Sequence, residues 1–263
     1  MRLDQTLESL LIEASVKSGK HLRDHAFDPG NIKWKKEDDP VTDRDIEAER
    51  IIIDTLCIPL NMKVIGEESG YNTTKKESCK LTAIIDPLDG TKSYLRREFN
   101  TAVSIAIEEE NQLIAGSVYD FMRDILYVGF KGNTYLVHNG KIEPFKQLIT
   151  KEKIGIITTA DPQKISKEDR MKLQKLRKDP KIHLTGRNGS IALALAHTAL
   201  GIYDSTIFFH EKIGNVWDIA AGVYLLQCTK HQISDSYENP FDIYNTNNGI
   251  MALGPRYLEH LFH

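Results

Sequence analysis

The chain has 263 residues, a formal net charge of -3 and 41% hydrophobic residues, and these values exclude several classes of protein. The length fits one large domain or two modest ones, and a charged fraction of 27% argues against disorder. The small negative charge does not indicate a nucleic-acid-binding protein, which favours a basic patch. The 3 cysteines lack the paired spacing of a zinc site, and an odd number does not suit a disulfide framework.

The start of the chain and the hydropathy pattern predict a cytoplasmic protein. Residues 1–4 carry mixed charge and are not followed by the apolar core of a signal peptide, which argues against secretion. No stretch approaches the roughly 20 consecutive apolar residues that a membrane helix needs. We therefore expect no membrane partner and no nucleic-acid partner.

The first half of the chain is predicted to combine helices with an antiparallel sheet. Leu3, Leu7, Leu10 and Leu11 indicate an amphipathic opening helix. Residues 26–41 are polar and contain two prolines, so we expect a loop there. A second helix is predicted at 43–57, followed by short strands at 62–65 and 81–85. An antiparallel meander is then predicted with strands at 101–108, 113–119, 125–130 and 133–137, and Asn139-Gly140 is a hairpin signal after it.

From about residue 150 the pattern changes to alternating strands and helices. Strands are expected at 153–159, 182–185 and 204–209, helices at about 165–178, 190–200 and after 217, and two further strands close the chain. The change predicts two domains that share one interface, an α+β domain at 1–150 and an α/β domain at 151–263.

The segment Asp-Pro-Leu-Asp-Gly-Thr at residues 86–91 carries the clearest chemical signal. An apolar stretch ends at Asp86, and a second carboxylate follows at Asp89. Pro87 fixes φ and Gly90 relieves the backbone, so a stiff turn can direct both carboxylates to one point. Two carboxylates so close repel each other unless a cation lies between them. The pattern predicts a site for a hard metal ion.

Further oxygen-bearing side chains are expected at strand ends and helix starts. They belong to Asp45, Glu67, Glu68, Thr91 and Asp218. Magnesium prefers oxygen ligands in near-octahedral geometry, so carboxylates from several segments suit it. Each residue alone has a simpler explanation: Asp45 completes a capping box with Thr42, and Asp218 favours a helix start. These simpler explanations suffice for each residue separately, but together they do not explain why all these oxygen-bearing side chains occur in one chain.

Gly90 and Thr91 add an anion site and a hydroxyl to the predicted metal site. A helix that begins there would present backbone amides to an anion such as phosphate. The Thr91 hydroxyl can orient a water molecule if Asp45 accepts its proton. The combination indicates metal-assisted hydrolysis of a phosphate ester.

Three segments resemble the signatures of the inositol monophosphatase superfamily, and their order and separation fit it as well. The segments are Gly-Glu-Glu at 66–68, Asp-Pro-Leu-Asp-Gly-Thr at 86–91 and Trp-Asp-Ile-Ala-Ala-Gly at 217–222. The resemblance covers nearly the whole chain. It implies an α/β (α+β) fold, a layered αβαβα sandwich of the sugar-phosphatase type, and a homodimer. The antiparallel sheet of 1–150 would carry most metal ligands, and 151–263 would complete the substrate pocket.

The resemblance also implies roles for individual residues. Two or three Mg²⁺ ions would be held by the side chains of Glu67, Asp86, Asp89 and Asp218 and by the carbonyl of Leu88. Thr91, with Asp45 as its partner, would activate a water that attacks phosphorus in line, without a covalent phosphoenzyme. The substrate would be bound by Gly90, Thr91, Gly189, Ser190 and Glu211.

The substrate itself stays open in the sequence. The first hypothesis is a small phosphate ester such as inositol 1-phosphate, with the lithium sensitivity that is common in the family. Glu211 favours inositol hydroxyls, whereas Lys92 is familiar from 3'(2'),5'-bisphosphate nucleotidases. A fructose-1,6-bisphosphatase and a non-enzymatic regulatory binding protein are further alternatives. We also expect the segment 26–41 to close over the site.

Overall fold

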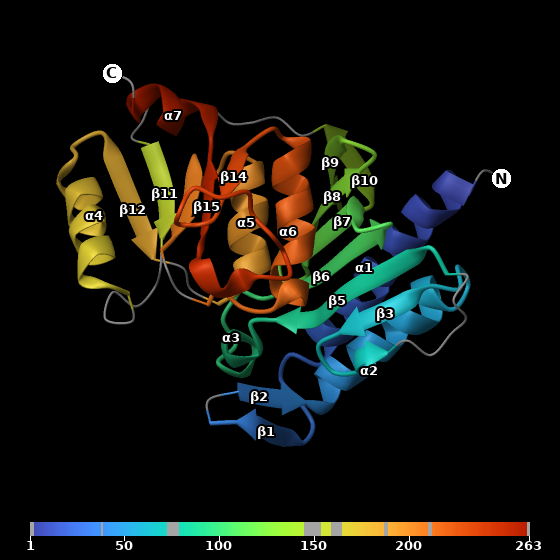
Figure 1. Ribbon diagram of the computed structural model, residues 1–263. Helices are drawn as coiled ribbons and strands as arrows, with labels where there is room; N and C mark the ends of the chain where they lie inside the picture. Colours follow the sequence, from blue (N-terminus) through green and yellow to red (C-terminus); the bar gives the residue numbers. More distant parts are fainter. Residues whose placement is uncertain are drawn as a thin grey trace.

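The computed structural model describes residues 3–37, 39–72, 79–144, 154–158, 165–186, 189–209 and 212–261, which form two large sheets with helices between and around them (Figure 1). The first sheet has 8 strands in the order β10-β9-β8-β7-β6-β5-β3-β4. Its strands are β3 (Lys63–Gly66), β4 (Gly70–Asn72), β5 (Leu81–Asp89), β6 (Ala102–Glu109), β7 (Gln112–Asp120), β8 (Ile125–Phe130), β9 (Asn133–His138) and β10 (Lys141–Pro144).

The second sheet has 5 strands in the order β12-β11-β13-β15-β14. Its strands are β11 (Ile154–Thr158), β12 (Ile182–Gly186), β13 (Ser205–Phe208), β14 (Gln232–Ser234) and β15 (Ile250–Leu253). β11 pairs in parallel with β12 and β13, whereas β15 runs antiparallel to β13 and β14.

The helices cover both sheets and fill the space between them. They are α1 (Leu3–Asp24), α2 (Asp43–Ile52), α3 (Thr91–Leu95), α4 (Lys167–Lys178), α5 (Ile191–Ala199), α6 (Val216–Cys228) and α7 (Pro255–Leu261). A π-helical turn, Ile53–Cys57, continues α2, and Thr246–Asn248 forms a 3₁₀ turn. Among the described residues, no helix is both long and apolar enough to cross a membrane.

Three buried clusters define the layers. Alternate residues of a strand point to opposite faces, so Ile85 of β5 packs with α1 and α2 while Ile84 packs with α5 and α6. The cluster of α5 and α6 also includes Phe208 of β13, so these helices lie between the sheets. Leu173 of α4 and Tyr257 of α7 pack on the outer face of the second sheet. This order confirms the predicted αβαβα sandwich; the division into two domains at residue 150 stays a prediction.

Most predicted elements are confirmed, including the helix at 43–57, the meander and the hairpin at Asn139-Gly140. The prediction of a loop over 26–41 was wrong, because β1 (Ile32–Lys36) and β2 (Asp39–Thr42) pair as an antiparallel hairpin. All five residues of β1 are exposed, so the strand has no buried face and carries no alternating apolar signal. The C-terminal helix α7 was not predicted.

The buried ring of His197 on α5 predicts how the stability of the protein changes at acidic pH. Its ring lies between Tyr127 and Tyr203, at centroid distances of 5.8 and 6.5 Å. Burial, together with the charge of Arg123, lowers the pKa of His197 to about 4. The unfolded chain, with an ordinary histidine pKa of about 6.5, therefore binds more protons between these values, and stability falls as the pH drops through that window.

We expect His197→Phe to reduce the loss of unfolding free energy between pH 7 and pH 5 by on the order of 1 kcal/mol. Urea unfolding of both proteins at the two pH values measures it. Equal losses in the variant and the parent protein would contradict the assignment of a neutral, buried ring.

Candidate active site

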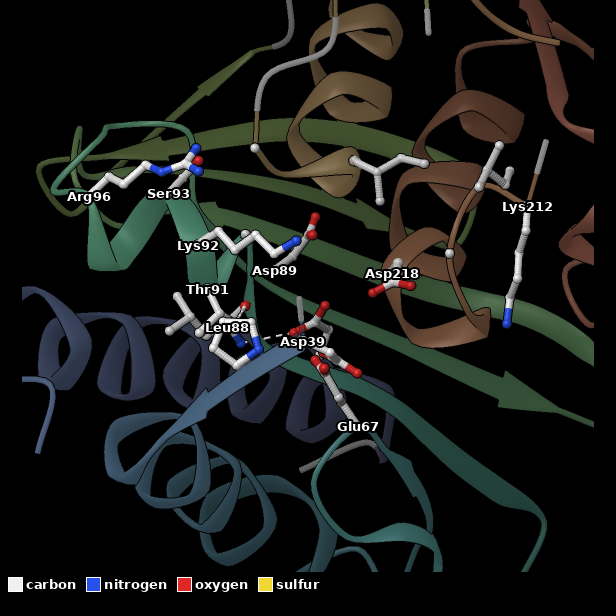
Figure 2. A pocket seen from close by; sticks show the side chains of 17 residues that line it. Asp39, Glu67, Leu88, Asp89, Thr91, Lys92, Ser93, Arg96, Lys212 and Asp218 are labelled. Atoms are coloured by element: carbon white, nitrogen blue, oxygen red, sulfur yellow. Dashed lines mark hydrogen bonds between the residues drawn. The ribbon is translucent and has the colours of Figure 1, made fainter. Parts of the chain in front are cut away.

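A cavity of about 550 Å³ opens where β5, α3, α6 and the β1–β2 hairpin meet (Figure 2). Most of its wall is polar or charged. It is lined by Asp39, Pro40, Glu67, Asp86, Leu88, Asp89, Gly90, Thr91, Lys92, Ser93, Arg96, Gly189, Ile191, Lys212, Ile213, Gly214 and Asp218.

A bulge in β5 turns the two aspartates of the 86–91 segment toward the same side. Asp86 pairs with Ser104 of β6 and Asp89 pairs with Ala102, so three residue steps on β5 face two on β6. In a regular strand, residues three apart point to opposite faces. The extra residue restores a common face, as bulges beside active sites do. The predicted end of this strand at residue 85 was therefore wrong, because β5 continues through the bulge to Asp89.

Three carboxylates from three different elements meet at this point. Glu67 follows the end of β3, Asp86 lies on β5, and Asp218 lies in the first turn of α6. One oxygen of each lies within 4.8 Å of the others. The backbone amide of Asn215 donates to Asp218, so the start of α6 fixes this carboxylate. Asp218 therefore has the helix-start role that was its simpler explanation in the sequence, and it also belongs to the group of carboxylates.

Burial and mutual repulsion make the charged form of these carboxylates unfavourable unless a cation is bound. Burial, followed by the charges of Glu67, Asp89 and Asp218, raises the pKa of Asp86 well above its usual range. Burial and the charge of Asp89 likewise raise the pKa of Asp218. Such groups either hold protons or share a positive ion. Because all donors are hard oxygens, the set fits magnesium and does not resemble a zinc site.

Asp89 joins the cavity to the second half of the chain. Its Oδ2 atom accepts hydrogen bonds from the Ser190 hydroxyl at 2.5 Å and from the Ala192 amide at 2.7 Å. Both donors belong to the first turn of α5, where Ser190 also accepts from the Leu193 amide and caps the helix. Asp89 lines the cavity but is not one of the three carboxylates that converge most closely.

Thr91 and Asp45 form the predicted hydroxyl–carboxylate pair. The Thr91 hydroxyl lies 3.1 Å from Asp45 Oδ1 and 3.1 Å from the Leu88 carbonyl. The other Asp45 oxygen accepts from the amide and hydroxyl of Thr42, at 3.0 and 2.5 Å. Asp45 therefore completes the capping box of α2 and binds Thr91 at the same time. Burial raises the pKa of Asp45 to about 6, against the lowering effect of these hydrogen bonds.

Gly90 allows the backbone to turn sharply between the metal ligands and α3. Its φ is 95°, a conformation that other residues rarely adopt. A Cβ atom at this position would lie 2.9 Å from the Asn100 carbonyl oxygen and 3.2 Å from the Ser190 amide. The short helix α3 begins directly after it at Thr91, which is the condition that the sequence set for an anion site at this turn.

The β1–β2 hairpin brings a lysine onto the acidic group. Lys35 Nζ lies 3.1 Å from Glu67 Oε1 and 2.7 Å from Glu68 Oε1. Burial favours the neutral amine of Lys35 and so lowers its pKa, but the two glutamates outweigh this effect and raise the pKa above its usual value. Burial raises the pKa of Glu68 to about 7. Sequence reasoning missed Lys35 because it lies in the segment that was taken for a loop.

Three other cationic side chains line the cavity itself, and they lie on opposite sides of it. Figure 2 shows Lys92 of α3 and Arg96, which directly follows α3, at one side and Lys212 at the other, with the carboxylates between them. Arg96 and Lys212 are exposed, and Lys92 is half-buried. The sequence did not single out Lys212, whose only signal is its position six residues before Asp218.

The structure brings together most of the residues that the sequence singled out. Eight of them line the cavity: Glu67, Asp86, Leu88, Asp89, Gly90, Thr91, Gly189 and Asp218. Asp45 lies behind Thr91. Ser190 is buried against Asp89 and is not on the cavity wall, so a direct contact with substrate stays a prediction. Glu211 lies outside the described residues.

Comparisons with known proteins identify relatives of this chain. A model of the inositol monophosphatase family matches residues 3–262. The inositol-1-monophosphatase of Bacillus subtilis is 30% identical over 226 residues, which cover 85% of this chain and 82% of that protein. The 3'(2'),5'-bisphosphate nucleotidase CysQ of Buchnera aphidicola is 26% identical, over 73% of this chain and 69% of that protein. The solved structure of the extragenic suppressor protein SuhB from Bartonella henselae superposes with a TM-score of 0.81 at 23% identity, covering 97% of this chain and 96% of that one.

The ion pair of Lys35 makes a prediction about metal affinity. Because the ammonium and a metal ion compete for Glu67, Lys35→Met should bind Mg²⁺ more tightly than the parent protein, by about tenfold if the pair contributes ~1.4 kcal/mol. Isothermal titration calorimetry measures the affinity. Lys33→Met, on the same strand, is the matched control. Weaker binding in Lys35→Met than in the control would show that Lys35 assists the ion instead.

Proposed function

The chain belongs to the inositol monophosphatase family, a family of phosphatases, and we propose that it is a magnesium-dependent phosphomonoesterase that hydrolyses a small phosphate ester such as inositol 1-phosphate. One observation carries the proposal. Oxygens of Glu67, Asp86 and Asp218 converge within 4.8 Å, and the Asp45-bound hydroxyl of Thr91 lines the same cavity. A binding protein would need the carboxylates to hold an ion, but it would not need the hydroxyl–carboxylate pair.

The proposed ligands of magnesium are the three converging carboxylates, assisted by Asp89 and the Leu88 carbonyl. When bound, magnesium lowers the pKa of an attacking water and stabilises negative charge on the phosphate and on the leaving oxygen. The carboxylates would also hold the ion at the cavity wall, because each carboxylate is fixed by its own helix or strand. The number of ions, two or three, is part of the proposal.

Thr91 is proposed to orient the attacking water and to pass its own proton toward Asp45. The hydroxyl has one hydrogen and two acceptors within 3.1 Å, Asp45 Oδ1 and the Leu88 carbonyl. If the Leu88 carbonyl serves as a metal ligand, Asp45 is the acceptor that remains for the Thr91 hydroxyl. The Thr91 oxygen then keeps its lone pairs for a hydrogen bond from the water. Attack in line forms one P–O bond as the P–O bond to the leaving oxygen breaks; the water gives one proton toward Asp45 through Thr91, and the leaving oxygen takes one proton from solvent to become the alcohol.

The phosphate is proposed to bind at the start of α3, where the amides of Gly90 and Thr91 lie beside the carboxylates. Gly189 also lines the cavity, just before α5, and lies on the same side as Gly90, because both glycines approach the Asn100 carbonyl. The homodimer, the lithium sensitivity, the cytoplasmic location and the role of Glu211 stay predictions.

A doubly phosphorylated substrate is the second candidate. Lys92 and Arg96 line the cavity on one side of the carboxylates and Lys212 lines it on the other, and this positive charge suits a second phosphate. The Buchnera relative named as a 3'(2'),5'-bisphosphate nucleotidase supports the same candidate. Fructose 1,6-bisphosphate belongs to this class as well.

We expect Thr91→Ala to lower kcat for the best substrate by about 10²–10⁴-fold, the usual contribution of a positioned proton-transfer group. Thr91→Ser keeps the hydroxyl and is the matched control, with activity close to that of the parent protein. The measurement is phosphate release from inositol 1-phosphate with and without Mg²⁺. Full activity of Thr91→Ala, or full activity after removal of divalent ions, would refute the mechanism. No release from any phosphate ester would favour a regulatory binding protein.

The choice of substrate is tested with Lys92→Gln and Arg96→Gln. If a second phosphate contacts these side chains, KM for adenosine 3',5'-bisphosphate or fructose 1,6-bisphosphate should rise about tenfold or more, since a charge-assisted hydrogen bond contributes ~1.5–3 kcal/mol. KM for inositol 1-phosphate should change little. Lys80→Gln, on an exposed lysine outside the cavity, is the control. Equal effects on all three substrates would reject the second phosphate site.

A further inference from the structure

Glu49 is a buried carboxylate close to the proposed site that the mechanism above does not use. It lies on α2 four residues after Asp45, so both side chains project from the same face of the helix. Only 3% of its surface is exposed. A buried carboxylate is costly unless it is hydrogen-bonded, so its partner indicates what it does.

The partner of Glu49 is the backbone of the segment that carries Glu67. Glu49 Oε2 accepts a hydrogen bond from the Glu68 amide at 3.0 Å. On the other side of Glu67, its own amide donates to the Ile85 carbonyl at 3.1 Å and so extends the pairing of β3 with β5. The backbone around Glu67 is therefore fixed at two successive amides, one held by β5 and one by Glu49.

Gly66 allows Glu49 to approach this closely. A Cβ atom on residue 66 would lie 2.5 Å from Glu49 Oε2 and 2.7 Å from the Ser69 hydroxyl oxygen. Any larger residue would displace the carboxylate or the turn. The glycine of the Gly-Glu-Glu segment thus has a physical reason, which is contact with a second carboxylate from α2.

We propose that Glu49 is a positioning residue, which holds the turn at 66–68 so that the Glu67 carboxylate meets Asp86 and Asp218. The inference rests on the proposed metal site. It extends that site to α2, which then directs two groups from successive turns. Asp45 binds Thr91, and Glu49 fixes the backbone beside Glu67. A shift of α2 would move the proposed water-orienting group and a proposed metal ligand together.

A purely structural role would have a different consequence. If Glu49 only joined α2 to β3, its loss would lower the stability of the metal-free protein and leave the affinity for the ion unchanged. Loss of a group that orients a metal ligand typically weakens metal binding by about 10–100-fold. Affinity, measured directly, separates the two roles.

The test compares Glu49→Ala and Glu49→Gln with Asp169→Ala. Asp169 is also a buried helical carboxylate: it lies in the first turn of α4, at the outer face of the second sheet, and accepts from the hydroxyl of Ser166, which caps that helix. Mg²⁺ affinity is measured by calorimetry, and the melting temperature is measured without metal. We expect Glu49→Ala to weaken Mg²⁺ binding by about tenfold or more. Glu49→Gln, which keeps an acceptor oxygen, should recover most of the affinity, and Asp169→Ala should lose stability alone.

Gly66→Ala provides a second arm that leaves Glu49 in the chain. It should weaken Mg²⁺ binding in the same way, because the added Cβ atom pushes the carboxylate from the turn. The proposal is overturned if Glu49→Ala, or Gly66→Ala where the first variant does not fold, binds Mg²⁺ as tightly as Asp169→Ala. A parent protein that binds no Mg²⁺ would overturn the proposed function and this inference with it, whereas retained binding in the variants overturns the inference alone.

Discussion

The mutual repulsion of buried carboxylates is the constraint on which the site depends. Glu67, Asp86 and Asp218 bring oxygens within 4.8 Å of one another, and water is largely excluded from Asp86. Hydrophobic burial in the surrounding layers must hold them together against this repulsion, because none of the three elements could do so alone. A cation removes the repulsion, so the cluster of carboxylates is electrostatically unfavourable without an ion and becomes favourable when the ion binds. Lys35 supplies part of that positive charge from the protein itself.

The layered architecture explains why the three carboxylates can come from distant parts of the chain. β5 is inside the first sheet and presents one face to α5 and α6, so Asp86 and Asp89 point at the starts of these two helices. α6 contributes Asp218 from its first turn, while α5 is capped through Asp89 and Ser190. The helix starts therefore fix the carboxylates, and the carboxylates fix the helix starts. Disruption of either should loosen the contact between the two sheets.

Apolar periodicity predicted most helices and strands, and the 66–68, 86–91 and 217–222 segments predicted the chemical core of the site, because both depend on local signals. The layered sandwich followed only from the family resemblance that those segments carry. Sequence reasoning missed features that depend on pairing between strands. The bulge that orients Asp86 and Asp89 arises from their register with β6 and has no local pattern. Lys35 could not be found because an exposed hairpin resembles a polar loop. Glu49 was not singled out, since its partner is a backbone amide 19 residues away and leaves no local pattern.

The hairpin that was expected to be a loop changes how closure over the site should be understood. Asp39 and Pro40 of β2 already line the cavity, and Lys35 of β1 already binds the acidic group. Two strands joined by backbone hydrogen bonds move as a unit, so entry of an ion at Glu67 has to displace the Lys35 ammonium or share the carboxylate with it. β1 has no buried face of its own, so its contacts with the site are those of Lys35 and of its partner strand β2. Occupancy of the metal site and the position of the hairpin are therefore linked through the ion pairs of Lys35 with Glu67 and Glu68.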